Sequence, residues 1–235
     1  MDFWLCLENQ LTELYHDLAE DNYTHGVYKH FVAQDTKRRD IYVAKVRDRV
    51  VHQLVAEYLE YKFGASFYCH SYAAQRGKGV SAARTYALKI IRRLNHHQVW
   101  IAKLDVRKYF SNVNHDILIQ LLSRKIKDVK IMDLCRKIIE SFGVDGNGLP
   151  LGNLTSQWFA NIYLHELDFY AKHGLKIKHY LRYNDDMILI SDNKQELSVF
   201  VGQIQHFVSE RLLLDIPREK IAITALPKPV DILGL

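Results

Sequence analysis

The sequence has few cysteines and no long apolar run, and each shortage excludes a class of protein. Its three cysteines, Cys6, Cys69 and Cys135, lie far apart and show no paired spacing. This argues against a disulfide framework and a cysteine-based zinc site, and it favours a reducing compartment. No apolar run approaches the roughly 18 residues that span a bilayer, and the first twenty residues contain acids but no lysine or arginine. We therefore expect a soluble, cytoplasmic protein without a secretory signal or a membrane partner.

Several familiar catalytic patterns are also missing. The twelve histidines include no His-Glu-x-x-His pair, so a zinc protease is disfavoured. Residues 76–79 (RGKG) do not form a phosphate-binding P-loop, because Lys78 is followed by glycine and Tyr72 stands where that loop needs glycine. Ser156 has no histidine and carboxylate companions in the order of a hydrolase motif.

The positive charge is modest in total but concentrated locally. The net charge is only +5 for 235 residues. Lysines and arginines nevertheless gather between residues 37 and 49 and again between residues 76 and 93. Such local concentration is expected of a face that binds phosphates. A solvated helix face gives the same pattern, so charge alone leaves both interpretations open.

The spacing of apolar residues predicts alternating helices and strands. Helices are expected over residues 1–20, 48–63, 82–94, 155–170 and 194–213. Residues 31–46, with an alternating piece at 41–44, are expected to form a strand or a hairpin. Further strands are expected over residues 99–105, in a hairpin of 179–183 with 187–191, and in a last pair of 220–224 with 230–233. Asn114 is suited to cap a helix whose apolar positions begin at Ile117. Helices interspersed with hairpins are typical of the α+β class.

The sharpest chemical feature is an acidic turn between two apolar strands. Asp185 and Asp186 follow Tyr183-Asn184, and Asp105 ends a separate apolar strand. Two like charges about 4 Å apart repel by roughly 4 kcal/mol at an effective dielectric near 20. A fully wet turn tolerates this repulsion, and so does a turn that binds a divalent cation. If the strands are neighbours, the three carboxylates converge into a site suited to two Mg²⁺ ions and phosphoryl transfer.

The segments around these acids resemble a known family. Residues 105–113 (DVRKYFSNV), 148–157 (GLPLGNLTSQ) and 183–186 (YNDD) are similar, in order and spacing, to three central motifs of reverse transcriptases. Further matches are residues 37–41 (KRRDI), 47–52 (RDRVVH), 71–79 (SYAAQRGKG), Lys220 and 232–234 (ILG). The resemblance covers nearly the whole chain. It implies RNA-directed DNA synthesis by nucleotidyl transfer, with two Mg²⁺ ions or Mn²⁺ as cofactor.

The resemblance also implies a domain arrangement. It predicts right-hand polymerase fingers and palm, with an antiparallel palm sheet covered by helices. Residues 1–98 are expected to form an N-terminal helix and the fingers, and residues 99–235 the palm, with a fingers insertion around 111–150. The family normally continues into a helical thumb, which we expect to be absent or truncated after Leu235.

One motif points to a subfamily. Most relatives have glutamine where Leu151 stands and proline where Gln157 stands. The version in this chain resembles the reverse transcriptases of bacterial and phage diversity-generating retroelements, in which an aliphatic residue at the Leu151 position is associated with misincorporation opposite template adenines. Replacing an amide by an aliphatic side chain removes hydrogen bonds, which lowers discrimination between bases.

The family's residue roles carry over onto matching positions. Asp105 and Asp185 resemble the metal ligands, and Asp186 completes the acidic triad. Lys220 matches a proton donor to pyrophosphate, although a solvent-facing strand lysine would look the same. Phe110 matches the bulky residue that excludes a 2′-hydroxyl, with a core position beside Tyr109 as its alternative. The remaining nucleotide-binding residues implied are Lys37, Arg39, Leu151, Gly152 and Gln157.

Partners follow from the same resemblance. They are template RNA, a primer or growing cDNA, dNTPs and a small helical accessory protein of the retroelement. Asn184 departs from the family, which usually has a small or apolar residue before the two aspartates, and this affects how a primer is expected to sit. The competing interpretations are a retron, group II intron-like or defence-associated reverse transcriptase, and a catalytically inactive RNA-binding relative.

Overall fold

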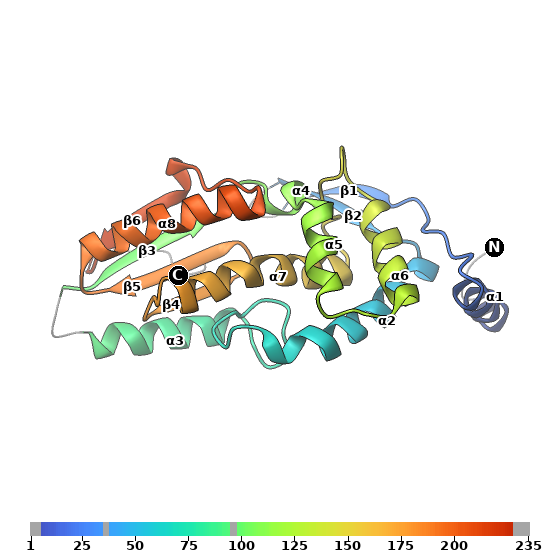
Figure 1. Ribbon diagram of the computed structural model, residues 1–235, viewed down its shortest axis with the longest axis horizontal. Helices are drawn as coiled ribbons and strands as arrows, with labels where there is room; N and C mark the ends of the chain where they lie inside the picture. Colours follow the sequence, from blue (N-terminus) through green and yellow to red (C-terminus); the bar gives the residue numbers. More distant parts are fainter. Residues whose placement is uncertain (1–5, 35–37, 95–97, 228–235) are drawn as a thin grey trace. The chain divides into compact units, whose positions relative to one another are not determined.

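The computed structural model describes residues 6–34, 38–94 and 98–227, and Figure 1 shows its helices and strands. The chain forms two compact units. The first comprises residues 1–65 and 114–159, and the second comprises residues 66–113 and 160–235. The three predicted acidic residues and Lys220 all belong to the second unit, whereas Leu151 and Gly152 belong to the first.

The first unit combines a β-hairpin with helices. Its elements are α1 (Leu7–Ala19), β1 (Lys29–Gln34), β2 (Arg38–Val43), α2 (Val46–Phe63), α5 (His115–Ser123), α6 (Val129–Glu140) and the start of α7 (Leu154–Phe169). Strands β1 and β2 pair antiparallel. Helix α2 buries Val51, Val55 and Leu59. The predicted cap is confirmed, because the Ile117 amide donates to the Asn114 side chain at 3.0 Å.

The second unit is built on a four-stranded antiparallel sheet. Its elements are α3 (Val80–Arg93), β3 (Trp100–Asp105), α4 (Tyr109–Asn112), the end of α7, β4 (Tyr180–Tyr183), β5 (Asp186–Ser191), α8 (Lys194–Leu212) and β6 (Ile221–Ala225). The strand order is β4-β5-β3-β6, so β3 has β5 on one side and β6 on the other. The α+β class predicted from the sequence is confirmed.

The two faces of this sheet are covered by different helices. Ile101, Leu181 and Ile188 form a buried cluster with Ala87 and Ile90 of α3. Side chains alternate along a strand, so the intervening residues point to the opposite face, against which α8 packs. Figure 1 shows α3 and α8 on opposite sides of the sheet. Both faces are therefore sealed along most of β3, and the acidic end of the sheet is where polar groups gather.

Several boundaries and elements differ from the sequence expectation. Helix α6 and the short α4 were not predicted, and α7 continues into a π-helical segment, Tyr170–Gly174. Lys220 ends a 3-10 helix, Arg218–Lys220, instead of opening strand β6. The expected strand 230–233, the motif at 232–234 and Lys37 lie outside the described residues. Within the described ranges, no helix is both long enough and apolar enough to span a membrane.

Candidate functional site

The sheet register brings the predicted acids to one edge of the second unit. Asp105 is the last residue of β3 and Asp186 is the first residue of β5, and the two are directly opposite each other. The hairpin turn consists of Asn184, in the left-handed region with φ 50°, followed by Asp185. Directly opposite residues in an antiparallel pair have Cβ atoms about 4.5–5.5 Å apart. Three carboxylates from two separate parts of the sequence thus lie close together.

The environment of these acids is strongly electrostatic. The pKa of Asp185 is raised to about 6, mainly by burial and also by the charges of Asp105 and Asp186, against the opposing effects of its own backbone amide and of Lys220. Lys220 Nζ lies 2.5 Å from Asp105 Oδ2, and Lys103 Nζ lies 3.8 Å from Asp186 Oδ1. The hydrogen bond to Asp105 raises the pKa of Lys220 in return. The crowded carboxylates are therefore balanced by two ammonium groups.

The side chains of this site have the ligand atoms that a hard divalent cation prefers. Asp105, Asp185 and Asp186 offer only oxygen ligands, which Mg²⁺ and Mn²⁺ prefer. As the side chains stand, no group of three His, Cys, Asp or Glu residues in the described part of the chain is arranged to hold a metal ion. The ammonium groups of Lys103 and Lys220 contact two of the carboxylates instead. The residues fit the ions by chemistry and by backbone position, and binding requires these side chains to turn.

The structure distinguishes Tyr109 from Phe110, one of which was expected to be a core aromatic residue and the other to face the site. The Tyr109 ring is buried, and its hydroxyl donates to the Ala160 carbonyl at 2.5 Å. Phe110 is only partly buried and lies edge-on to Tyr109, with ring centroids 5.5 Å apart. Tyr109 is thus the core aromatic residue, and Phe110 is the one that remains accessible next to the strand that ends at Asp105.

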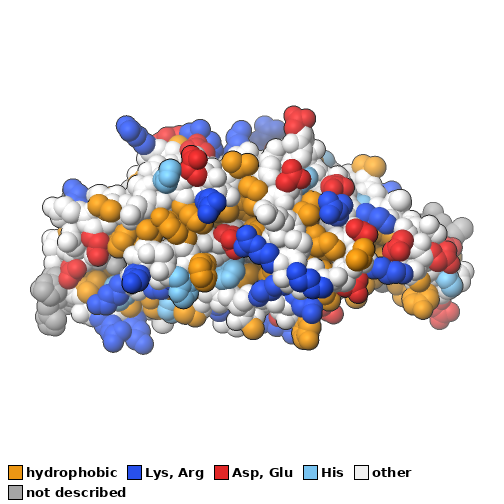
Figure 2. Space-filling view, in the orientation of Figure 1, with side chains coloured by type: hydrophobic (Ala, Val, Ile, Leu, Met, Phe, Trp, Pro, Cys, Tyr) orange, Lys and Arg blue, Asp and Glu red, His pale blue; other side chains and the backbone are white. Residues whose placement is uncertain are grey.

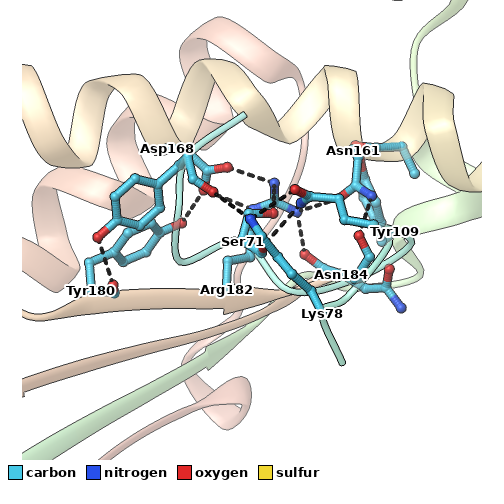
Figure 3. Close-up of polar contacts among 12 residues, drawn as sticks. Ser71, Lys78, Tyr109, Asn161, Asp168, Tyr180, Arg182 and Asn184 are labelled. Atoms are coloured by element: carbon cyan, nitrogen blue, oxygen red, sulfur yellow. Dashed lines mark hydrogen bonds and ion pairs between the residues drawn. The ribbon is translucent and has the colours of Figure 1, made fainter. Parts of the chain in front are cut away.

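Sequence reasoning missed a buried polar network around Arg182, shown in Figure 3. The fully buried guanidinium donates to Asp168 through two nitrogens, at 2.8 and 2.6 Å. It also donates to Ser71 Oγ at 3.0 Å and to Asn161 Oδ1 at 3.2 Å. Its remaining contact reaches the Asn184 carbonyl at 2.9 Å. Burial alone would lower the pKa of Arg182, and the Asp168 carboxylate reverses this and raises it.

This network reaches the acidic turn through the backbone. The Asn184 carbonyl that Arg182 binds belongs to the same peptide unit as the Asp185 amide. That peptide unit is planar, so fixing its oxygen also fixes the amide next to the Asp185 carboxylate. The signal in the sequence was a charged residue between apolar neighbours in the strand Tyr180–Tyr183. Such a charge must have a partner when it is buried.

The remaining predicted residues lie in the first unit. Arg39 is an exposed residue of β2, opposite Ala33 of β1. Leu151 is tied to the same strand, because the Tyr42 amide donates to its carbonyl at 2.8 Å. Gly152 has φ 113°, and a Cβ there would lie 2.8 Å from Ile41 Cγ2. Gln157 is an exposed residue of α7.

A glycine at position 152 is therefore required by packing against β2 as well as by its backbone conformation. Asn153 strengthens the same junction, since its side chain accepts from the Ala44 amide at 3.1 Å and donates to the Tyr42 carbonyl at 2.6 Å. The structure thus brings the 151–153 loop to the β-hairpin that carries Arg39.

Comparison with protein families identifies the chain. The family model described as "Reverse transcriptase (RNA-dependent DNA polymerase)" matches residues 29–235. The chain belongs to the reverse transcriptase family. Its match to the group II intron-encoded protein LtrA of Lactococcus lactis subsp. cremoris is 23% identical and covers 97% of this chain and 49% of that protein. A putative COX1/OXI3 intron 2 protein of Saccharomyces cerevisiae is 30% identical over 57% of this chain and 16% of its own length.

Solved structures show the same fold. Telomerase from Candida tropicalis, in complex with a TWJ fragment of telomeric RNA, superposes with a TM-score of 0.65 at 15% identity, over 93% of this chain and 45% of that one. The corresponding structure from Candida albicans superposes with a TM-score of 0.66 at 12% identity, over 95% of this chain and 46% of that one. At such identities the likeness establishes the reverse transcriptase fold alone. The chain spans about half or less of the length of these relatives.

Proposed function

We propose that this protein is an RNA-directed DNA polymerase that uses Asp105, Asp185 and Asp186 as its catalytic carboxylates. The observation that carries the proposal is the direct pairing of Asp105 with Asp186 across β3 and β5, with Asp185 in the adjoining turn. Membership of the reverse transcriptase family supplies the reaction type. Template RNA, a primer and dNTPs are the substrates that such a reaction needs.

Each side chain has a defined task in the proposed reaction. The carboxylates of Asp105, Asp185 and Asp186 hold the cations in place of the two lysine ammonium groups. When bound, two Mg²⁺ ions activate the primer hydroxyl and stabilise charge on the leaving pyrophosphate. Lys220 keeps a proton on Nζ within the site and can give it to pyrophosphate. Phe110, which is partly exposed and follows Asp105 by five residues, limits space at the sugar of the incoming nucleotide.

The first unit is proposed to hold the nucleotide and the template base. Arg39 and Lys37 supply positive charge for the triphosphate, which suits a forked guanidinium and a point charge. Leu151, Gly152 and Gln157 are proposed to lie near the templating base. Leu151 offers no hydrogen bond from its side chain, and this is the physical basis for low fidelity opposite template adenine.

Two finer functions follow from different observations. Leu151 and Gln157 favour an error-prone enzyme of a diversity-generating retroelement, which would work with a small helical accessory protein. Similarity to the group II intron-encoded protein LtrA over 97% of this chain favours a group II intron-like enzyme. Misincorporation distinguishes them, because the first type is expected to err mainly at template adenines and to improve in Leu151→Gln.

Primer extension tests the main proposal. The purified chain is given a primed RNA template, Mg²⁺ and dNTPs, and wild type is compared with Asp185→Asn. A matched control is Asp192→Asn, which removes an exposed carboxylate just after β5 in the same unit. Extension by wild type and the control, and its loss in Asp185→Asn, would support the proposal. RNA binding without extension in any of the three would instead identify an inactive RNA-binding relative.

A further inference from the structure

A second surface of the unit that carries the carboxylates is strongly basic. Helix α3, residues 80–93, contains no aspartate or glutamate. Its last turns expose Lys89, Arg92 and Arg93, while Ala87 and Ile90 face the core. Figure 2 shows Lys and Arg side chains gathered over this end of α3. The helix thus has one apolar side against the sheet and one cationic side in solvent.

The segment that leads into β4 extends this basic surface. Residues 171–179 contain three lysines and no acid, and Lys176 and Lys178 are exposed. Helix α3 packs against β4. Burial lowers the pKa of His179, and the charges of Lys178, Lys172 and Arg93 lower it further against the opposing charge of Asp192. Cations of α3 and of residues 171–179 therefore lie close enough to influence the same histidine.

Among the residues that the structure describes, these cations have no carboxylate partner. In the described part of the chain, none of Lys89, Arg92, Arg93, Lys176 and Lys178 forms an ion pair with a carboxylate within 4.0 Å. Some exposed cations elsewhere do pair with carboxylates, since Arg107 pairs with Asp215 and Glu219, and Arg136 pairs with Glu140. Five unpaired like charges repel one another, and a polyanion relieves that repulsion.

The basic surface is separate from the carboxylate site. Helix α3 ends at Arg93, shortly before β3 begins at Trp100, whereas Asp105 lies at the far end of β3. Five strand steps of about 3.4 Å put roughly 17 Å between the two ends. A ligand on the basic surface therefore need not occupy the carboxylate site. The surface also contains an open hollow lined by Thr85, Leu88, Lys89, Arg92 and Arg93.

We propose that Lys89, Arg92, Arg93, Lys176 and Lys178 form a second RNA-binding surface, which holds the phosphodiester backbone of RNA outside the carboxylate site. The chemistry is that of backbone recognition, in which lysine and arginine neutralise phosphates and release counterions without reading sequence. The exposed Leu88 in the hollow can contact a ribose or base between the phosphates. RNA as the occupant rests on the proposed function.

The test compares two triple variants with the same change in net charge. Arg92→Gln, Arg93→Gln and Lys178→Gln together remove part of the basic surface. Lys125→Gln, Lys127→Gln and Lys130→Gln together remove three exposed cations from the first unit. Binding of a fluorescent RNA hairpin with a single-stranded extension is followed by anisotropy, in EDTA and without dNTPs. The measurement thus reads binding alone.

Loss of three phosphate contacts is expected to weaken binding about tenfold or more near 0.15 M salt. It is also expected to reduce the slope of log K against log salt by about one for each cation removed. The control triple variant should stay within about twofold of wild type. Equal weakening in both variants, or no weakening in the first, would overturn the proposal.

Two further arms distinguish RNA from an anionic membrane, and the basic surface from the carboxylate site. Vesicles of phosphatidylcholine with phosphatidylserine represent the membrane, and stronger loss of vesicle binding than of RNA binding would overturn the assignment to RNA. Asp185→Asn should bind the hairpin like wild type, because its change lies at the opposite end of the sheet. If wild type failed to extend a primer but its RNA binding still depended on the basic surface, the proposed function would be rejected. The inference of a second RNA-binding surface would remain.

Discussion

Replacing Arg182 tests whether the buried network positions Asp185 (Figure 3). Arg182→Lys keeps the positive charge beside Asp168 but lacks the fork that reaches Ser71 and Asn184 together. A hydrogen bond to a charged group contributes about 1.5–3 kcal/mol, so we expect a loss of about 2–4 kcal/mol in unfolding free energy. Arg182→Met would leave the Asp168 carboxylate buried with a tyrosine partner, at a cost of about 3–5 kcal/mol.

The effect on activity should exceed the effect of lower stability. Without the contact to its carbonyl, the Asn184–Asp185 peptide is free to rotate, and a shift of about 1 Å in a catalytic group can cost about a hundredfold in rate. The control is Tyr180→Phe, which removes the 2.8 Å hydrogen bond to Asp168 and leaves every contact of Arg182 in place. Its extension rate should stay within about twofold of wild type.

The assay combines urea titration with single-turnover primer extension at a temperature where all variants are fully folded. Mn²⁺ binding, followed by electron paramagnetic resonance without substrate, supplies a readout that does not need turnover. Arg182→Lys should bind Mn²⁺ more weakly and extend about a hundredfold more slowly. Equal rates for Arg182→Lys and Tyr180→Phe, with unchanged Mn²⁺ binding, would refute the argument and leave the network a purely structural role.

Three other predictions concern the first unit. Burial lowers the pKa of His52 to about 4, so the folded state prefers the neutral imidazole. The unfolding free energy should fall by about 3 kcal/mol as the pH drops from about 6.5 to 4, and His52→Gln should flatten this slope in urea titrations. Gly152→Ala places an alanine at φ 113° with its Cβ 2.8 Å from Ile41, so its unfolding free energy should fall by about 1–3 kcal/mol. The control Gly146→Ala, at φ 72° with open space around it, should lose less unfolding free energy. Asn114→Ala should lower the unfolding free energy by about 1 kcal/mol through loss of its helix cap, measured the same way.

The sequence was sufficient to predict features that depend on local pattern. Short apolar runs predicted β3 and the hairpin of β4 and β5, and the Asn114 cap followed from its side-chain chemistry. Helix α6 was missed, although its apolar residues Leu134, Ile138 and Ile139 recur at helical spacing and Asp128 caps it. The apolar spacing and the cap would therefore have been sufficient to predict α6 from the sequence.

Features that depend on contacts distant in sequence could not be predicted. Nothing around Arg182 indicates that Ser71, Asn161 and Asp168 will surround it, because they lie up to 111 residues away. The choice between Tyr109 and Phe110 as the core aromatic depended likewise on the Ala160 carbonyl, which the fold supplies. Residue type suggested that a buried charge needs partners, and only the fold decides which ones.

The register of β3 and β5 restricts how this part of the sequence can change. Asp105 lies opposite Asp186, and the turn between β4 and β5 contains only Asn184 and Asp185. Adding or deleting one residue in β5 would turn every side chain of the strand to the opposite face. Asp186 would then point toward α8, and Met187 would face the site. A single substitution in β5 keeps this register, whereas a change in the length of the strand would move a carboxylate out of the site and a core residue into it.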